Sequence, residues 1–176
     1  MKADLLTESG RKFKDPALEE RYQEYKHRKE LQGETPRDRL GWKQASDWWV
    51  NESPMARGND FNAKARAERW YKVHELNLED GTRLDSYVQD KEIISRKATD
   101  LSDIDVSTFE SYLDELKEKY PEGKIIRSNQ YPKLDGKPLK GQHVLEIPDS
   151  NRSFKDINKY IEMAKKRGIE IRFRPE

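Results

Sequence analysis

Charged side chains suited to phosphodiester chemistry gather in residues 83–97, where the sequence predicts a tight β-hairpin. The candidates are Asp85 on its first strand and Glu92, Ser95, Arg96 and Lys97 on its second. Carboxylates on paired strands can hold a divalent cation, and a lysine can orient water and offset the charge of a phosphate. The pattern favours a metal-dependent phosphodiesterase, and a solvated hairpin is the alternative in a chain this highly charged.

The register of this hairpin decides which side chains share a face, because successive side chains of a strand point to opposite sides. A two-residue turn places Asp85 on one face with Glu92 and Arg96. A three-residue turn pairs Asp85 with Ser95 instead and puts it on one face with Lys97. A catalytic role for Lys97 requires the second register or a bulge, and the sequence leaves both registers open.

The composition limits how the 176 residues are organised and what they bind. Only 33% of the residues are hydrophobic, and they gather from Phe61 onward, so the core must lie there. With 35 basic and 34 acidic residues the net charge is +1, so a nucleic-acid site must be a local basic patch. The chain has no cysteine, which excludes disulfides and thiolate metal sites. We expect a soluble chain without a membrane segment, because no apolar run is long enough to span a bilayer.

A helical lead-in at residues 1–52 is expected to precede a domain at residues 53–176. Asp15 begins the first helix of the lead-in, as an N-cap before a proline. Large aromatic side chains in this segment need burial, and we expect them to pack against the following domain: Trp42, Trp48 and Trp49.

The second part is predicted to be a mixed α/β (α+β) domain with the order helix, three-strand meander, helix, strand, helix, strand. Pro54 is expected to end the lead-in, and residues 59–60 to cap the next helix, which carries Glu68. The strands are expected at residues 73–78, 82–88, 92–99, 144–147 and 169–174.

Two basic regions are candidates for contact with a phosphate backbone. The loop at residues 124–141 carries five basic residues against one acid: Lys124, Arg127, Lys133, Lys137 and Lys140 against Asp135. The last strand adds Arg172 and Arg174. A solvated loop is nearly as good an interpretation. His74 and His143 are expected to be structural, because their spacing does not suit a histidine-based nuclease.

This order of elements resembles the core of the restriction-endonuclease-like fold of the PD-(D/E)xK nucleases. The resemblance implies that Asp85 is the aspartate of the second strand, Lys97 the lysine of the third, and Glu68 the glutamate of the first helix. Ser95 stands where the family pattern has an acid. Either Glu92 is expected to supply the missing carboxylate, or Ser95 to act through a metal-bound water.

Several strings are also similar to C-terminal toxin domains of LXG-type polymorphic toxins, which type VII secretion exports from Gram-positive bacteria. They are residues 53–62, 83–87, 91–100, 145–148 and 169–174. The resemblance covers the chain well from about residue 53 to its end. It implies a secreted antibacterial nuclease effector that acts in the target-cell cytoplasm and is neutralised by a cognate immunity protein.

The implied reaction is hydrolysis of nucleic-acid phosphodiesters, with DNA favoured over RNA. Asp85 and Glu92 are expected to hold Mg²⁺ or Mn²⁺ through oxygen. Lys97 is expected to position the attacking water, Arg96 to contact the phosphate, and Glu68 to reach a metal-bound water. Two alternatives stay open. One is a metal-independent RNase toxin in which Arg96, Lys97 and a carboxylate do the acid–base work, and the other is a non-catalytic binding module on the same fold.

Overall fold

The computed structural model describes residues 2–176 of the chain. It divides into two compact units, one extending to Ala56 and the other running from Arg57 to Glu176. The boundary lies inside a helix, shortly after the predicted end of the lead-in at residue 52. In the described part of the chain, no helix has both the length and the apolar character needed to cross a bilayer.

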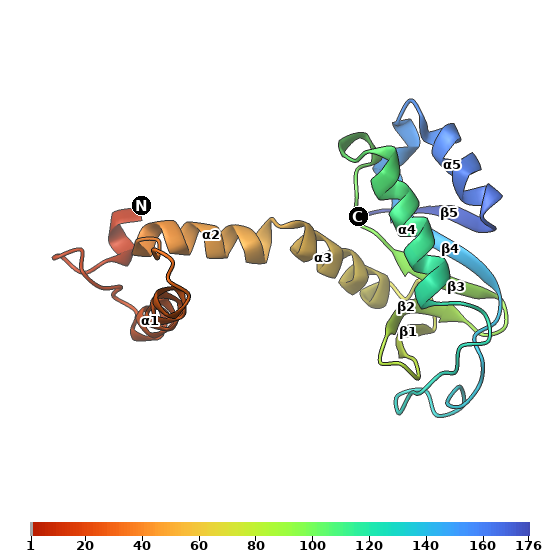
Figure 1. Cartoon of the computed structure of the whole chain (residues 1–176), viewed down its shortest axis with the longest axis horizontal. Helices are drawn as coiled ribbons and strands as arrows, with labels where there is room; N and C mark the ends of the chain where they lie inside the picture. Colours follow the sequence, from red (N-terminus) through yellow and green to blue (C-terminus); the bar gives the residue numbers. More distant parts are fainter. Residues whose placement is uncertain (1) are drawn as a thin grey trace. The chain divides into compact units, whose positions relative to one another are not determined.

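The first unit is helical and contains α1 (Pro16–Leu31) and α2 (Arg39–Asn51) after a short 3-10 turn, η1 (Lys2–Leu5) (Figure 1). Asp15 caps α1 as predicted, because its carboxylate accepts a hydrogen bond from the backbone N–H of Ala17. The local signal in the sequence was therefore sufficient to locate the start of this helix.

An aromatic cluster forms the core of the first unit. Trp42 packs against Phe13, Tyr22 and Tyr25, whose ring centroids lie 5.9, 5.6 and 6.0 Å from its own. Trp42 is thus partly buried within its own unit, contrary to the prediction that it packs against the following domain. The other two tryptophans of α2 have 47% and 54% of their surface exposed.

The helix α3 (Pro54–Ala67) begins earlier than predicted. Ser53 precedes it, and the Ser53 hydroxyl accepts a hydrogen bond from the backbone N–H of Ala56 at 3.1 Å. Pro54 occupies the first turn, where its missing N–H would have had no partner within the helix. The predictions that Pro54 ends a segment and that the cap lies at residues 59–60 are therefore wrong.

The second unit is built on a five-stranded mixed sheet with the strand order β1-β2-β3-β4-β5. The strands are β1 (Val73–Asn77), β2 (Arg83–Val88), β3 (Glu92–Arg96), β4 (Gln142–Pro148) and β5 (Ile169–Arg174). The first three form an antiparallel meander, and the last three pair in parallel. Parallel pairs need crossovers, which contain α4 (Val106–Lys119) and α5 (Ile157–Lys166). The mixed α/β class is confirmed.

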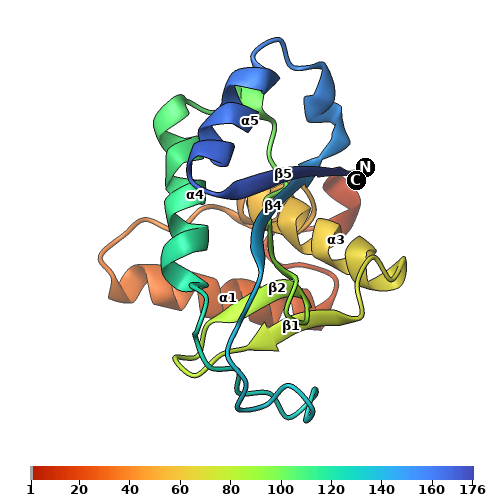
Figure 2. The ribbon, with the colours of Figure 1, turned by 90° about the vertical axis from the view of Figure 1, so that its right-hand side faces the viewer.

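Helices cover both faces of this sheet, with α4 and α3 on opposite sides (Figure 2). The helices α4 and α5 pack on β4 and β5 through a cluster that includes Phe109, Leu113, Leu116, Leu145, Ile147, Tyr160 and Ala164. A second cluster brings the loop between α4 and β4 onto the meander and includes Leu76, Leu84, Tyr87, Ile93, Ile126 and Leu139. The second cluster anchors β2 and β3, which carry the predicted site.

The β2–β3 hairpin adopts the second of the two registers left open by the sequence. Tyr87 pairs with Ile93, and Val88 pairs with Glu92, which leaves residues 89–91 as a three-residue turn. Asp90 has a φ of 61°, a conformation that aspartate tolerates in such turns. The register places Asp85 opposite Ser95 and not opposite Ile94.

Candidate active site

Asp85 lies where the pairing of β2 with β3 stops. The last pair of the ladder is Ser86 with Ile94, and Asp85 is the next residue of β2. Its carboxylate accepts a hydrogen bond from the backbone N–H of Arg96 at 2.7 Å and one from the Asn62 side chain at 3.3 Å. Asp85 therefore joins β2 to β3 and to α3, and its orientation is held by both contacts.

Burial raises the pKa of Asp85 above its ordinary value of 3.8. The backbone N–H of Arg96 and the positive charges of Arg96 and Lys97 act in the opposite direction, but they do not cancel the effect of burial. A nearby cation would stabilise the ionised form of such a carboxylate. Asp85 therefore has the electrostatic character of a functional group more than that of a solvated surface acid.

Lys97 lies on the α4 side of the sheet, one residue beyond the end of β3. Ser95 pairs with Leu145, a member of the core beneath α4, so Ser95 also faces that side. The Lys97 ammonium lies 3.1 Å from the carboxylate of Glu115 and 5.2 Å from the ring centroid of Tyr112, both residues of α4. Its charge also lowers the pKa of Asp85, as expected for neighbouring groups of opposite charge.

Glu115 is a candidate site residue that the sequence interpretation missed. Its side chain is 34% exposed and bonds to Lys97 and, at 2.8 Å, to Lys119. Burial acts to raise the pKa of Glu115, but hydrogen bonds and charges of the two lysines leave it below the ordinary value of 4.5. The signal in the sequence was weak: an acid three residues after Tyr112 flanks the apolar stripe of the helix, as many solvated acids do.

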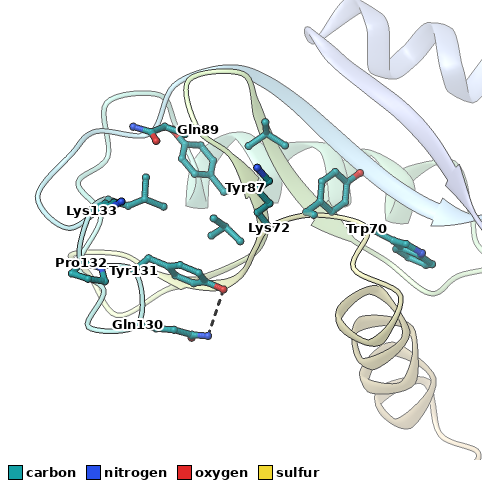
Figure 3. Close-up of a pocket in the computed structure, with 12 residues that line it drawn as sticks. Trp70, Lys72, Tyr87, Gln89, Gln130, Tyr131, Pro132 and Lys133 are labelled. Atoms are coloured by element: carbon teal, nitrogen blue, oxygen red, sulfur yellow. Dashed lines mark hydrogen bonds between the residues drawn. The ribbon is translucent and has the colours of Figure 1, made fainter.

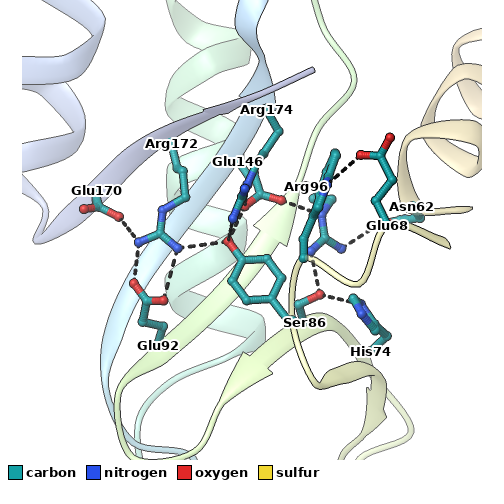
Figure 4. A network of polar contacts seen from close by, with 12 residues as sticks. Asn62, Glu68, His74, Ser86, Glu92, Arg96, Glu146, Glu170, Arg172 and Arg174 are labelled. Carbon is teal, nitrogen blue, oxygen red and sulfur yellow. Dashed lines mark hydrogen bonds and ion pairs between the residues drawn. The ribbon is translucent and has the colours of Figure 1, made fainter. Parts of the chain in front are cut away.

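Arg96 is a structural residue in this geometry. Its guanidinium forms an ion pair with Glu146 of β4 at 2.6 Å, and the two side chains are 2% and 0% exposed. It also donates to Ser86 at 2.5 Å and to the Asn62 side-chain oxygen at 3.2 Å (Figure 4). With these donors engaged inside the protein, the predicted contact of Arg96 with a phosphate has no support in the geometry.

Glu92 does not approach Asp85. Glu92 lies opposite Val88, three positions along the hairpin from Asp85 and so about 10 Å away. Its carboxylate pairs with Arg172 of β5, with 3.1 Å for one of the two contacts, and this contact lowers the pKa of Glu92 (Figure 4). Glu92 lies on the other face of the sheet, where it pairs with β5. The prediction that Asp85 and Glu92 bind one cation therefore lacks geometric support.

The arginines of β5 belong to the same polar network. Arg172 also bonds to Glu170 at 2.6 Å, and Arg174 lies 3.5 Å from Glu146 with Tyr71 beside it. The Tyr71 hydroxyl donates to Glu146. Because these arginines have acidic partners, the predicted grip of β5 on a phosphate backbone is not what this arrangement favours.

The helix α3 ends at Ala67, so Glu68 lies just beyond the helix and not on it as predicted. Its carboxylate accepts a hydrogen bond from the indole N–H of Trp70 at 2.9 Å, and the side chain is 48% exposed. The predicted role of Glu68 at a metal-bound water thus receives no positional support.

Both core histidines are hydrogen-bonded as structural residues. His74 Nδ1 lies 3.0 Å from the Ser86 hydroxyl, and His143 Nε2 lies 2.6 Å from the backbone oxygen of Tyr120. Burial lowers the pKa of each imidazole below 6.5, so both favour the neutral form at neutral pH.

Lys97 connects two carboxylates: it bonds to Glu115 at 3.1 Å, and its charge lowers the pKa of Asp85. Within residues 2–176, no three histidine, aspartate or glutamate side chains gather as a ready-made metal site. Mg²⁺ often binds through one or two carboxylates, waters and the phosphate of the substrate, so two acids are a suitable donor set. The raised pKa of buried Asp85 fits a bound cation, which would stabilise its ionised form.

Comparison with known proteins adds no family: no family model matches this chain, and no curated protein or solved structure matches it.

Proposed function

We propose that the chain is a metal-dependent nuclease whose reaction centre consists of Asp85, Lys97 and Glu115. The observation that carries the proposal is the part-buried Asp85 carboxylate at the end of the β2–β3 ladder, which the backbone N–H of Arg96 holds and whose raised pKa the charge of Lys97 acts upon. A carboxylate and an ammonium held together on rigid strands are the groups that phosphodiester hydrolysis requires.

Asp85 and Glu115 would hold Mg²⁺ or Mn²⁺, which supplies positive charge to a phosphate and lowers the pKa of bound water. Lys97 would orient the attacking water and offset the negative charge that develops on the phosphate. The backbone N–H of Arg96 and the Asn62 side chain keep the Asp85 carboxylate in place. Glu115 restrains Lys97 from the α4 side.

The restriction-endonuclease-like identity of the fold is part of this proposal. It is supported by the order of the elements along the chain: α3, the β1–β3 meander, α4 and β4. The resemblance implies this order. It is also supported by Asp85 on β2 and by Lys97 at the end of β3. Glu115 would replace the acid that Ser95 does not provide, which is the role first expected of Glu92.

The biological role proposed for this nuclease is that of a secreted antibacterial toxin domain acting on DNA in the target cell. This role is supported only by the strings that resemble LXG-type toxin domains. It implies a cognate immunity protein as partner. Co-expression with the product of a neighbouring gene should then restore growth of cells that the chain alone arrests, and nucleoids should persist in the protected cells.

A single-turnover cleavage assay tests the proposed reaction. The full chain is incubated with plasmid DNA or with transfer RNA, each in Mg²⁺ and in EDTA. We expect the plasmid to be cut in Mg²⁺ and left intact in EDTA. Cleavage of the RNA in EDTA would instead identify a metal-independent RNase. If both substrates stay intact in both buffers, the non-catalytic binding module is the better description.

A further inference from the structure

A cavity of about 640 Å³ opens beside the start of β1 and the end of β2 (Figure 3). Three segments form its wall: residues 70–73, residues 87–89 and residues 130–134. None of the twelve residues that line the cavity is acidic. In a chain with 34 acids, a cavity wall without a carboxylate suits an anionic or neutral ligand.

Three tyrosines line this wall, and the hydroxyl groups of two of them, Tyr131 and Tyr87, are anchored by backbone N–H groups. The hydroxyl of Tyr131 accepts a hydrogen bond from the backbone N–H of His74 at 3.0 Å. The hydroxyl of Tyr87 accepts one from the backbone N–H of Lys140 at 3.1 Å. The Tyr131 ring, which is partly exposed, is thus fixed by its polar end beside the cavity (Figure 3), whereas Tyr87 is 1% exposed and belongs to the core behind the cavity wall. Fixed aromatic surfaces are what stacking of a planar ligand requires.

Polar side chains surround the aromatic part of the cavity. Lys72 and Lys133 bring positive charge from two segments, and Gln89 and Gln130 bring exposed amides. An amide can donate to and accept from the edge of a base, and an ammonium can contact a phosphate. Lys133 belongs to the loop at residues 124–141, which carries five basic residues and one acid.

We infer that this cavity binds an unpaired nucleobase of a single-stranded nucleic acid, with its phosphates toward Lys72 and Lys133. The inference rests on the proposed nuclease function and adds a contact with unpaired regions of its substrate. A base stacked in a duplex cannot enter a cavity, whereas an unpaired base can stack on aromatic side chains there. Tyr87 lies two residues from Asp85 on β2, about 7 Å along the strand, so one short stretch of substrate could occupy both places.

Binding is measured without cleavage, on the full chain in EDTA, with a fluorescein-labelled 15-nucleotide single strand and the duplex of the same sequence. We expect the single strand to bind about tenfold more tightly than the duplex at equal salt. Lys133→Glu should weaken single-strand binding about tenfold, and Lys137→Glu, the same charge change in the same loop outside the cavity, much less. Equal loss in both variants would overturn the inference.

The stacking role of Tyr131 has its own variants. Tyr131→Ala should weaken binding of the single strand about tenfold, whereas Tyr131→Phe, which keeps the ring and loses only its hydrogen bond from His74, should weaken it much less. Equal loss in both, or equal affinity for strand and duplex, removes the base-binding role. If the plasmid is still cut in Mg²⁺, the nuclease proposal survives that result. Tight single-strand binding without any cleavage in Mg²⁺ would overturn the nuclease proposal and leave the cavity assignment standing.

Discussion

The ammonium of Lys97 lies 3.1 Å from the carboxylate of Glu115, so an ion pair joins the end of β3 to α4. The two side chains are 28% and 34% exposed, which leaves the pair accessible from solvent. The contact brings an acid to the side of the sheet that Ser95 faces, where the family pattern expects a carboxylate. Substitution of Glu115 therefore tests the proposed site directly.

Glu115→Gln should reduce kcat/KM for plasmid cleavage at least about tenfold and raise the Mg²⁺ concentration needed for half-maximal rate. The amide keeps the shape of the side chain but removes the charge that would bind a cation. Glu118→Gln is the matched control, since Glu118 is an exposed acid of the same helix. Equal activity of the two variants would remove Glu115 from the site.

Asp85→Asn should abolish cleavage, with a loss of about 100-fold or more, and yet increase thermal stability at pH 7. Burial raises the pKa of Asp85 above 3.8, so its contribution to stability is present below that pH and is lost as the pH rises through the folded-state pKa. The neutral amide avoids this loss, and its oxygen can still accept from the Arg96 N–H. Melting curves from pH 3.5 to 7 should therefore separate as the pH rises; a variant less stable at pH 7 contradicts the assignment.

Mg²⁺ should stabilise the wild-type chain, because a ligand that binds only the folded state raises the free energy of unfolding. The melting temperature should rise with Mg²⁺ concentration and return to its starting value after addition of EDTA. Asp85→Asn should show little of this rise. The same rise in both proteins would place the cation elsewhere.

Glu146→Gln should destabilise the chain by about 3–5 kcal/mol, because it leaves the buried Arg96 guanidinium without its charge partner. The control is Glu75→Gln, which breaks an ion pair with Arg66 whose side chains are each 42% exposed. That change should cost about 1 kcal/mol or less. Urea unfolding measures both; similar losses in the two variants would show that the Arg96–Glu146 pair is not a structural centre.

Glu92→Gln should retain most of the wild-type kcat/KM, because Glu92 pairs with Arg172 and does not reach Asp85. Its effect should be on stability. The Arg172 contact lowers the pKa of Glu92, so the stabilisation is present above 4.5 and is lost as the pH falls through the folded-state pKa. Stability curves of wild type and variant should therefore converge on acidification. A large loss of activity would restore Glu92 as a metal ligand.

The sequence by itself determined the local elements of this protein. The Asp15 cap before a proline located α1, and the alternation from Ile169 to Arg174 located β5. The helix α4 has its own local signal, because the Asp105 side chain caps it by accepting from the backbone N–H of Thr108. Such signals act over a few residues, so neighbouring side chains are enough to specify them.

Tertiary structure alone decided which of the candidate side chains meet. The hairpin register placed Asp85 with Ser95 and Lys97, and a slip of one residue would have reversed that choice. Glu115 contacts Lys97, which is 18 residues away in the sequence, and Arg172 pairs with Glu92, which is 80 residues away. These contacts depend on how α4 and β5 pack against the sheet. Spacing along the chain carries no direct record of that packing, because one periodic pattern is compatible with many arrangements of the elements.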